Sequence, residues 1–136
     1  MEERYRIGVP EMDAQHARLF ELLERAQVPD PDEGEVQLLV LDLVNYAKSH
    51  LELEEKFLAE QGLHDFLKSH VGLHRDFRVR AMEVYNALRE ADSLELKQKI
   101  LRDTVEFCDQ WLREHIDVED RAYADLLRAK GSVAVG

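Results

Sequence analysis

Apolar residues recur along most of this chain at alternating intervals of three and four positions. This spacing places them on one face of an α-helix. One such stripe runs through Leu67, His70, His74, Phe77, Ala81, Val84 and Leu88. Because His70 and His74 are four residues apart on this stripe, both imidazoles point into the same core. Burying neutral imidazoles without partners costs free energy, so a common partner for the two rings is expected inside the fold.

Capping and helix-breaking residues separate four segments of this kind. The apolar stripes and helices are expected at 12–26, 36–58, about 65–90 and 94 to about 128. Asp13 is expected to cap the first helix, and Asp32 with Glu35 has the spacing of a capping box before the second. Gly62 is placed to end the second helix in a left-handed conformation. Residues 92–95 are expected to cap the fourth helix.

Four amphipathic helices joined by short connections predict an all-α fold, an antiparallel up-down four-helix bundle. With 136 residues, six glycines and three prolines, the chain is long enough for one real core and poor in turn residues. We expect a single domain over 1–136, with a short N-terminal arm at 1–11, the bundle at about 12–129 and a frayed tail at 130–136. Two apolar positions, Leu53 and Leu94, are expected to belong to the buried stripes.

Charge and cysteine content narrow the possible partners. The formal net charge is −11 without a basic cluster, so nucleic acids and anionic membrane surfaces are not expected to bind. The single cysteine, Cys108, excludes an internal disulfide framework and fits a reducing compartment. The chain has no membrane-length apolar run, and its first residues do not begin a signal peptide. We therefore expect a cytoplasmic protein, a monomer, with a protein partner left open.

Five of the six histidines lie on the inward stripes, and all four helices carry at least one of them. With one glutamate on the second stripe, the inward set is His16, His50, Glu54, His70, His74 and His115. His64 falls in a connection and is interpreted as a solvated or capping residue without a role. Five independent core histidines would each need a separate buried partner, whereas a metal site supplies one partner for all of them.

The composition of this set predicts which kind of metal site it forms. Imidazole suits zinc, copper, iron and nickel, but five histidines are too many for one tetrahedral zinc ion. The spacing therefore indicates a binuclear, nitrogen-rich site near the middle of the bundle. Ferritin-like di-iron proteins use more carboxylates and Glu-x-x-His motifs. Fewer carboxylates give less support to high-valent iron, which favours reversible ligand binding over oxidation chemistry.

Four sequence motifs resemble those of the hemerythrins, specifically the bacterial single-domain branch, the bacteriohemerythrins. They are Gly8–His16, His50-x-x-x-Glu54, His70-x-x-x-His74 and Trp111–Asp120. The motifs occur in the family's order and span nearly the whole chain. The arm lacks the tryptophan that bacterial members often carry, and Tyr5 is a candidate substitute.

This resemblance implies two iron ions, alternating between Fe2+ and Fe3+, joined by two bridging carboxylates and one bridging oxo or hydroxo group. It assigns one iron to His70, His74 and His115, and the second iron, with one open position for dioxygen, to His16 and His50. Glu54 and Asp120 would bridge the two metals. It also implies that Trp111, Leu112 and Ile116 line the oxygen pocket, although ordinary core packing explains these three residues about equally well.

One of these ligands does not follow from helical periodicity. From His115, a straight helix places Glu119 about 40° away and Asp120 about 140° away. Regular geometry thus favours Glu119, whereas the family motif selects Asp120. Both are satisfied only if the helix is locally unwound, for instance by a π-bulge. We expect such a distortion between His115 and Asp120, with Asp120 as the ligand.

The expected function is non-enzymatic: reversible dioxygen binding for storage, transport or delivery to a partner. The first alternative is an oxygen or redox sensor that acts on a partner protein. A di-iron peroxidase or nitric oxide reductase ranks third, because no acid or base stands out beyond the expected ligands.

Overall fold

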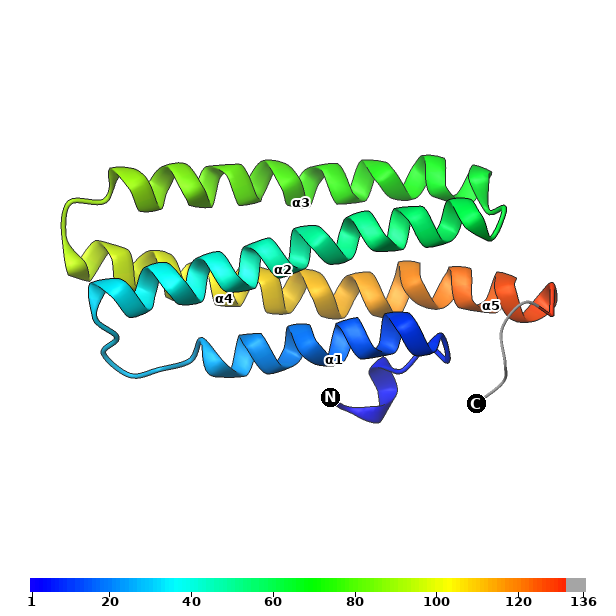
Figure 1. The fold of residues 1–136 in the computed structure, drawn as a ribbon, viewed down its shortest axis with the longest axis horizontal. Helices are drawn as coiled ribbons and strands as arrows, with labels where there is room; N and C mark the ends of the chain where they lie inside the picture. The colour runs from blue at the N-terminus through cyan, green and yellow to red at the C-terminus, as the bar shows by residue number, and fades with distance from the viewer. Residues whose placement is uncertain (132–136) are drawn as a thin grey trace.

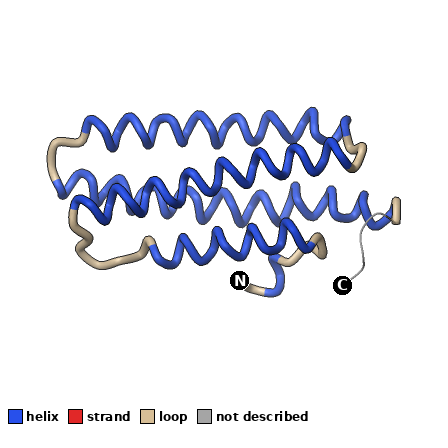
Figure 2. Tube along the Cα trace, in the orientation of Figure 1, coloured by secondary structure: helices blue, strands red, loops and turns tan. Residues whose placement is uncertain are grey.

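The computed structural model describes residues 1–131 and shows the predicted antiparallel four-helix bundle (Figure 1). Its helices are α1 (Pro10–Arg25), α2 (Glu33–Glu60), α3 (His64–Glu90) and α4 (Leu94–His115). A π-helical turn at Ile116–Asp120 then joins α4 to α5 (Arg121–Ala129), and the three segments form one rod along the bundle. A 3₁₀ turn, Glu3–Tyr5, precedes α1. Short connections link the helices at the two ends of the bundle (Figure 2).

Local side-chain chemistry fixes several helix ends as the sequence predicts. Asp32 caps α2: its carboxylate accepts the Glu35 backbone N–H at 2.8 Å, and the Glu35 carboxylate accepts the Asp32 N–H at 3.2 Å. Gly62 follows α2 with a φ of 77°, a left-handed conformation that glycine adopts without steric cost. The Ser93 hydroxyl accepts the Leu96 N–H at 3.1 Å and caps α4. These boundaries are confirmed.

The start of α1 corrects one prediction. The helix begins at Pro10, not at Asp13, because proline at the first position has the helical φ and lacks only an N–H that would have no partner there. Asp13 instead lies inside the first turn and reaches back along the chain. Its carboxylate accepts the backbone N–H groups of Ile7 at 2.8 Å and Gly8 at 3.1 Å. This contact holds the arm, which ends at residue 9, against the bundle.

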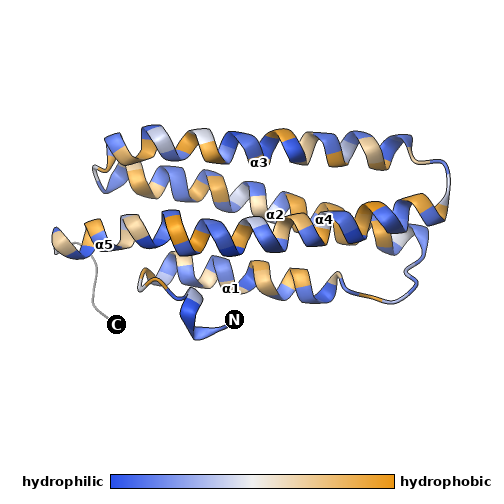
Figure 3. Ribbon diagram, turned by 180° about the vertical axis from the view of Figure 1, so that it is seen from behind, coloured by the Kyte–Doolittle hydropathy of each residue, from blue (hydrophilic) through white to orange (hydrophobic). Residues whose placement is uncertain are grey.

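The inward faces of the helices form one continuous hydrophobic core, visible as apolar stripes alternating with polar faces in Figure 3. The arm contributes Tyr5, Ile7 and Val9, each at most 3% exposed. Two expected core positions are wrong: Leu53 is 47% exposed and Leu94 is 44% exposed. Leu53 falls outside the stripe because the buried face of α2 passes through Leu51 and Glu54. Leu94 is exposed because it is the first residue of α4.

Cys108 lies in this core, 5% exposed and unpaired. Within residues 1–131, no helix combines the length and the apolar character needed to cross a membrane. Of the expected tail, Lys130 and Gly131 form a turn after α5, and 132–136 lie outside the described residues.

Candidate metal centre

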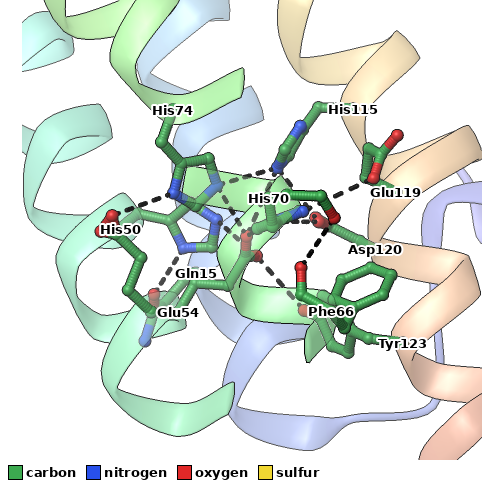
Figure 4. A network of polar contacts seen from close by, with 12 residues as sticks. Gln15, His50, Glu54, Phe66, His70, His74, His115, Glu119, Asp120 and Tyr123 are labelled. Atoms are coloured by element: carbon green, nitrogen blue, oxygen red, sulfur yellow. Dashed lines mark hydrogen bonds and ion pairs between the residues drawn. The ribbon is translucent and has the colours of Figure 1, made fainter. Parts of the chain in front are cut away.

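Four of the inward-facing histidines, His50, His70, His74 and His115, lie close together with Glu54 and Asp120 (Figure 4). Each helix supplies a part of the cluster, and none of its members is more than 5% exposed. The members are His16 on α1, His50 and Glu54 on α2, His70 and His74 on α3, His115 at the end of α4, and Asp120 at the end of the π-helical turn. His64 is the exposed first residue of α3 and takes no part.

Four of these residues form what we call the three-histidine group: Glu54, His70, His74 and His115. One ligand atom from each lies within 4.8 Å of all the others. Glu54 Oε1 is 2.6 Å from His70 Nε2, 3.0 Å from His74 Nε2 and 3.3 Å from His115 Nε2. The Nε2 atoms of His74 and His115 are 3.1 Å apart. All three imidazoles therefore direct the same ring nitrogen at one point.

A second set, the two-histidine group, consists of His16, His50, Glu54 and Asp120, with ligand atoms again within 4.8 Å of one another. His16 Nε2 lies 3.0 Å from Asp120 Oδ2, and His50 Nε2 lies 3.4 Å from Glu54 Oε2. The two imidazoles meet edge to face, with ring centroids 4.8 Å apart.

The carboxylates of Glu54 and Asp120 lie between the two groups. Each directs one oxygen at one group and its second oxygen at the other group. Glu54 directs Oε1 at the three-histidine group and Oε2 at His50. Asp120 directs Oδ2 at His16 and Oδ1 at His115, 3.2 Å from its Nε2. Each carboxylate can thus contact a metal in either group, the arrangement expected of bridging ligands.

The π-helical turn explains how Asp120 reaches this position. The distortion predicted after His115 is present as five π-helical residues, Ile116–Asp120. A π-helix adds a residue to the turn, which carries the Asp120 side chain inward to full burial and leaves the Glu119 side chain 30% exposed. Glu119 still lies beside the cluster, with Oε2 3.6 Å from His70 Nδ1.

Several buried polar atoms of the cluster lack hydrogen-bond partners among the protein atoms. These unpaired atoms show whether the cluster fits a metal. These atoms include His16 Nε2, His50 Nε2 and both carboxylate oxygens of Asp120. Buried polar groups are nearly always paired, so the missing partner is expected to be a cation. Ligand atoms about 2.1 Å from one ion and at right angles are about 3 Å apart, close to the His74–His115 separation of 3.1 Å. The donor set fits two metals.

The electrostatics of the cluster agree with this interpretation. Burial would raise the pKa of Glu54, but the surrounding histidines, His115 foremost, hold it well below its usual range. Burial and the Glu54 charge raise the pKa of Asp120 well above its usual range. Burial and the neighbouring His50 lower the pKa of His16 to about 3. The imidazole of His16 is therefore neutral near pH 7, the form that binds metals.

Other polar residues touch the cluster from outside and were not predicted from the sequence. The His50 Nδ1 atom lies 2.6 Å from the Gln15 amide oxygen. The Tyr123 hydroxyl donates a hydrogen bond to Glu54 Oε2 at 3.2 Å and is fully buried. Glu55 Oε1 lies 3.6 Å from His74 Nδ1. Of these residues, Tyr123 could have been predicted from helical spacing, because it lies three residues after Asp120 on the same inward face.

Two of the three expected pocket residues border a small apolar cavity beside His50. Its volume is about 10 Å³, close to the minimum for one water molecule. Trp111, Leu112 and Cys108 are among its lining residues, and His50 is the only histidine or charged residue there. Ile116 is fully buried but does not line this cavity. Trp111 also stacks on His115, with ring centroids 4.3 Å apart.

Comparison with known proteins shows the family to which the chain is similar. A family model described as the hemerythrin HHE cation binding domain matches residues 7–127. The chain is 29% identical over 127 residues to a bacteriohemerythrin of Stenotrophomonas maltophilia (strain R551-3), covering 90% of this chain and 77% of that protein. It is 26% identical over 129 residues to a bacteriohemerythrin of Clostridium acetobutylicum, covering 90% of this chain and 96% of the relative.

Proposed function

The chain belongs to the hemerythrin family, and from this premise we propose that it binds dioxygen reversibly at a pair of iron ions. His70, His74 and His115 would hold one iron, and His16 and His50 the other. Glu54 and Asp120 would bridge the two. A bound pair of irons would supply the two electrons that reversible dioxygen binding requires.

The observation that carries this proposal is the unequal division of the ligands. Three imidazoles converge in one group and two in the other, and Glu54 belongs to both groups. Asp120 belongs to the two-histidine group, but its Oδ1 also lies 3.2 Å from His115 Nε2, so it can serve both sides. For two ions of the same coordination number, the two-histidine group is short of one protein ligand. That deficit would leave a position for an exogenous ligand on the side of His16 and His50.

The surroundings of His50 favour a small apolar ligand at this position. The adjoining cavity is lined almost entirely by hydrophobic side chains, including Leu19, Leu51 and Leu112. Such walls exclude water and offer no proton to a bound ligand. The outer ring nitrogen of His50, Nδ1, is already engaged, because it lies 2.6 Å from the Gln15 amide oxygen. These residues therefore protect the ligand from protonation and side reactions.

The absence of a free acid or base facing the cavity favours binding over catalysis. Cys108 is the only nucleophile among the residues that line it. Burial raises the pKa of this thiol to about 12, so it is a poor nucleophile near pH 7. We therefore propose a binding protein for oxygen storage, transport or delivery, with no enzymatic turnover.

The test is an oxygen-binding measurement on the iron-loaded protein. The reduced protein is prepared without oxygen, its iron is counted per chain, and its visible spectrum is followed as air is admitted and then removed. We expect two irons per chain and an absorption change that reverses over repeated cycles. A control variant, His64→Ala, changes an exposed histidine and should behave as the wild type.

Three results would contradict the proposal. A chain that holds one metal, or none, lacks the predicted pair. Rapid irreversible oxidation, coupled to a change in oligomer or in partner binding, would indicate the sensor. Turnover of peroxide or nitric oxide faster than by free iron would indicate an enzyme.

A further inference from the structure

The histidines of the cluster differ in what lies behind their rings. A metal-bound imidazole uses one ring nitrogen for the ion and presents the other to a second partner, which fixes the ring and tunes its basicity. In this cluster Nε2 points inward, so Nδ1 is the outward atom. The Nδ1 atoms of His70 and His74 are buried and have no hydrogen-bond partner. What surrounds these two atoms decides how strongly their rings bind a metal.

A carboxylate stands behind each of the two rings. Glu119 Oε2 is 3.6 Å from His70 Nδ1, and Glu55 Oε1 is 3.6 Å from His74 Nδ1. A shift of about 0.5 Å would bring each pair to hydrogen-bond distance. The side chains of Glu55 and Glu119 are 19% and 30% exposed, so neither charge is fully screened by solvent.

Both carboxylates are held in place by the fold. Arg78 on α3 binds Glu55 with two parallel hydrogen bonds, 2.9 and 2.8 Å long, one to each oxygen. The bidentate pair restrains the carboxylate beside His74. Glu119 is placed by the π-helical turn, which directs Asp120 into the cluster and leaves the preceding residue behind His70. The same π-helical turn thus places Asp120 inside the cluster and Glu119 behind the His70 ring.

The two-histidine group has a different outer environment. His50 Nδ1 faces the neutral amide oxygen of Gln15 at 2.6 Å. His16 Nδ1 is buried and has no hydrogen-bond partner. A carboxylate that accepts an imidazole N–H increases the electron density on the ring and strengthens its bond to a cation, while an amide carries no charge and does so less. The three-histidine group therefore has both more histidines and more strongly electron-donating partners behind them, and both differences favour tighter metal binding there.

We propose that Glu55 and Glu119 are positioning residues that act through His74 and His70 to make the three-histidine group the tighter metal site, filled before the two-histidine group. This inference rests on the proposed two-metal site but not on oxygen binding. It assigns an order of assembly: the ion in the three-histidine group binds first and fixes Glu54 and Asp120 for the second ion.

The experiment is a titration of the metal-free protein with Co2+ without oxygen, followed by visible absorption and calorimetry. The wild type should bind two ions in a tight and a weaker step. Glu55→Gln and Glu119→Gln should each weaken the tight step 10- to 100-fold, the range for losing a partner behind a metal-bound histidine. Their matched controls, Glu52→Gln on α2 and Glu114→Gln in the last turn of α4, remove nearby exposed charges. They should leave both steps within about twofold of the wild type.

A second readout separates positioning from a structural role. The midpoint of thermal unfolding of each metal-free variant is measured beside the titration, and Glu55→Asp, which keeps the charge, should recover part of the affinity. Unchanged tight binding in both Glu→Gln variants would overturn the inference, as would equal losses in the two exposed controls. A wild type that binds fewer than two ions would instead refute the two-metal site. Because Glu55 lies on α2 and Glu119 in the π-helical turn, either variant tests the inference if the other fails to fold.

Discussion

Glu54 and Asp120 each direct one carboxylate oxygen at the three-histidine group and the other at the two-histidine group. They come from different helices and are both fully buried. Two buried carboxylates side by side repel each other. Burial and, after it, this repulsion by Glu54 raise the pKa of Asp120, and neither oxygen of Asp120 has a hydrogen-bond partner. Cations on both sides of this pair would remove that repulsion. The relationship therefore links the stability of the core to metal loading.

Removing one histidine from each group should have separable effects. His74→Ala deletes a ring of the three-histidine group, and we expect metal content to fall from two ions to one or fewer, with a lower unfolding midpoint, because binding energy at a buried site also stabilises the fold. His16→Ala should lose chiefly the ion of the two-histidine group. His64→Ala, at an exposed position, should keep two ions. Metal analysis and thermal unfolding check this, and a His74→Ala protein with two ions and a wild-type midpoint would contradict it.

Tyr123→Phe should weaken the support of Glu54 without disturbing the core. The substitution removes the hydroxyl that donates to Glu54 Oε2 but keeps the ring packed against Phe57 and Phe66. We expect a loss of about 1 kcal/mol in the free energy of unfolding of the metal-free protein. Tyr85→Phe, whose hydroxyl bonds Asn45 at the surface, should cost less. Denaturant unfolding measures the free energy of unfolding of both variants. Equal losses in Tyr123→Phe and Tyr85→Phe would contradict the prediction.

Asp13→Ala should release the N-terminal arm. The carboxylate accepts two backbone N–H groups from Ile7 and Gly8, and its loss leaves both donors without this partner. We expect a cost of about 1–2 kcal/mol, as for loss of a helix cap, and faster proteolysis at residues 1–9. Glu11→Ala, an exposed neighbour on the same turn, serves as the control. An arm that stays protected in Asp13→Ala would show that apolar burial alone holds it.

Cys108 should resist alkylation until the protein unfolds. Burial raises the pKa of its thiol to about 12, so the thiolate that reacts with iodoacetamide is scarce at pH 8. The folded-state pKa lies above the unfolded value, and burial therefore costs stability only as the pH rises above about 8.5. Mass spectrometry should show no modification in native buffer at pH 8 and complete modification in denaturant. Rapid labelling of the native protein would contradict the buried position.

The fold was predictable because its signals are local. Periodicity located the helices, and the capping residues Asp32, Gly62 and Ser93 located several of their ends. Asp13 was misassigned because the same carboxylate satisfies backbone donors whether it caps a helix or, as here, ties the preceding arm to the first turn. That choice depends on how the arm packs, which no local pattern encodes.

The cluster was predictable only in part. Inward spacing identified the five histidines and Glu54, and the conflict between Glu119 and Asp120 indicated the π-helical turn that is present. The partners behind the rings, Gln15 and Glu55, could not be found in this way. Both are polar residues adjacent to an inward-facing one, and many exposed residues share that position. Only the packing of α1, α2 and α3 brings them behind the histidines.

The most direct test of the two-metal site is to locate the metals. Crystals of the protein loaded with ferrous iron would be measured by anomalous diffraction at the iron edge. We expect two peaks per chain, one beside His70, His74 and His115 and the other beside His16 and His50, with Glu54 and Asp120 contacting both. A single peak, or two peaks outside these groups, would contradict it.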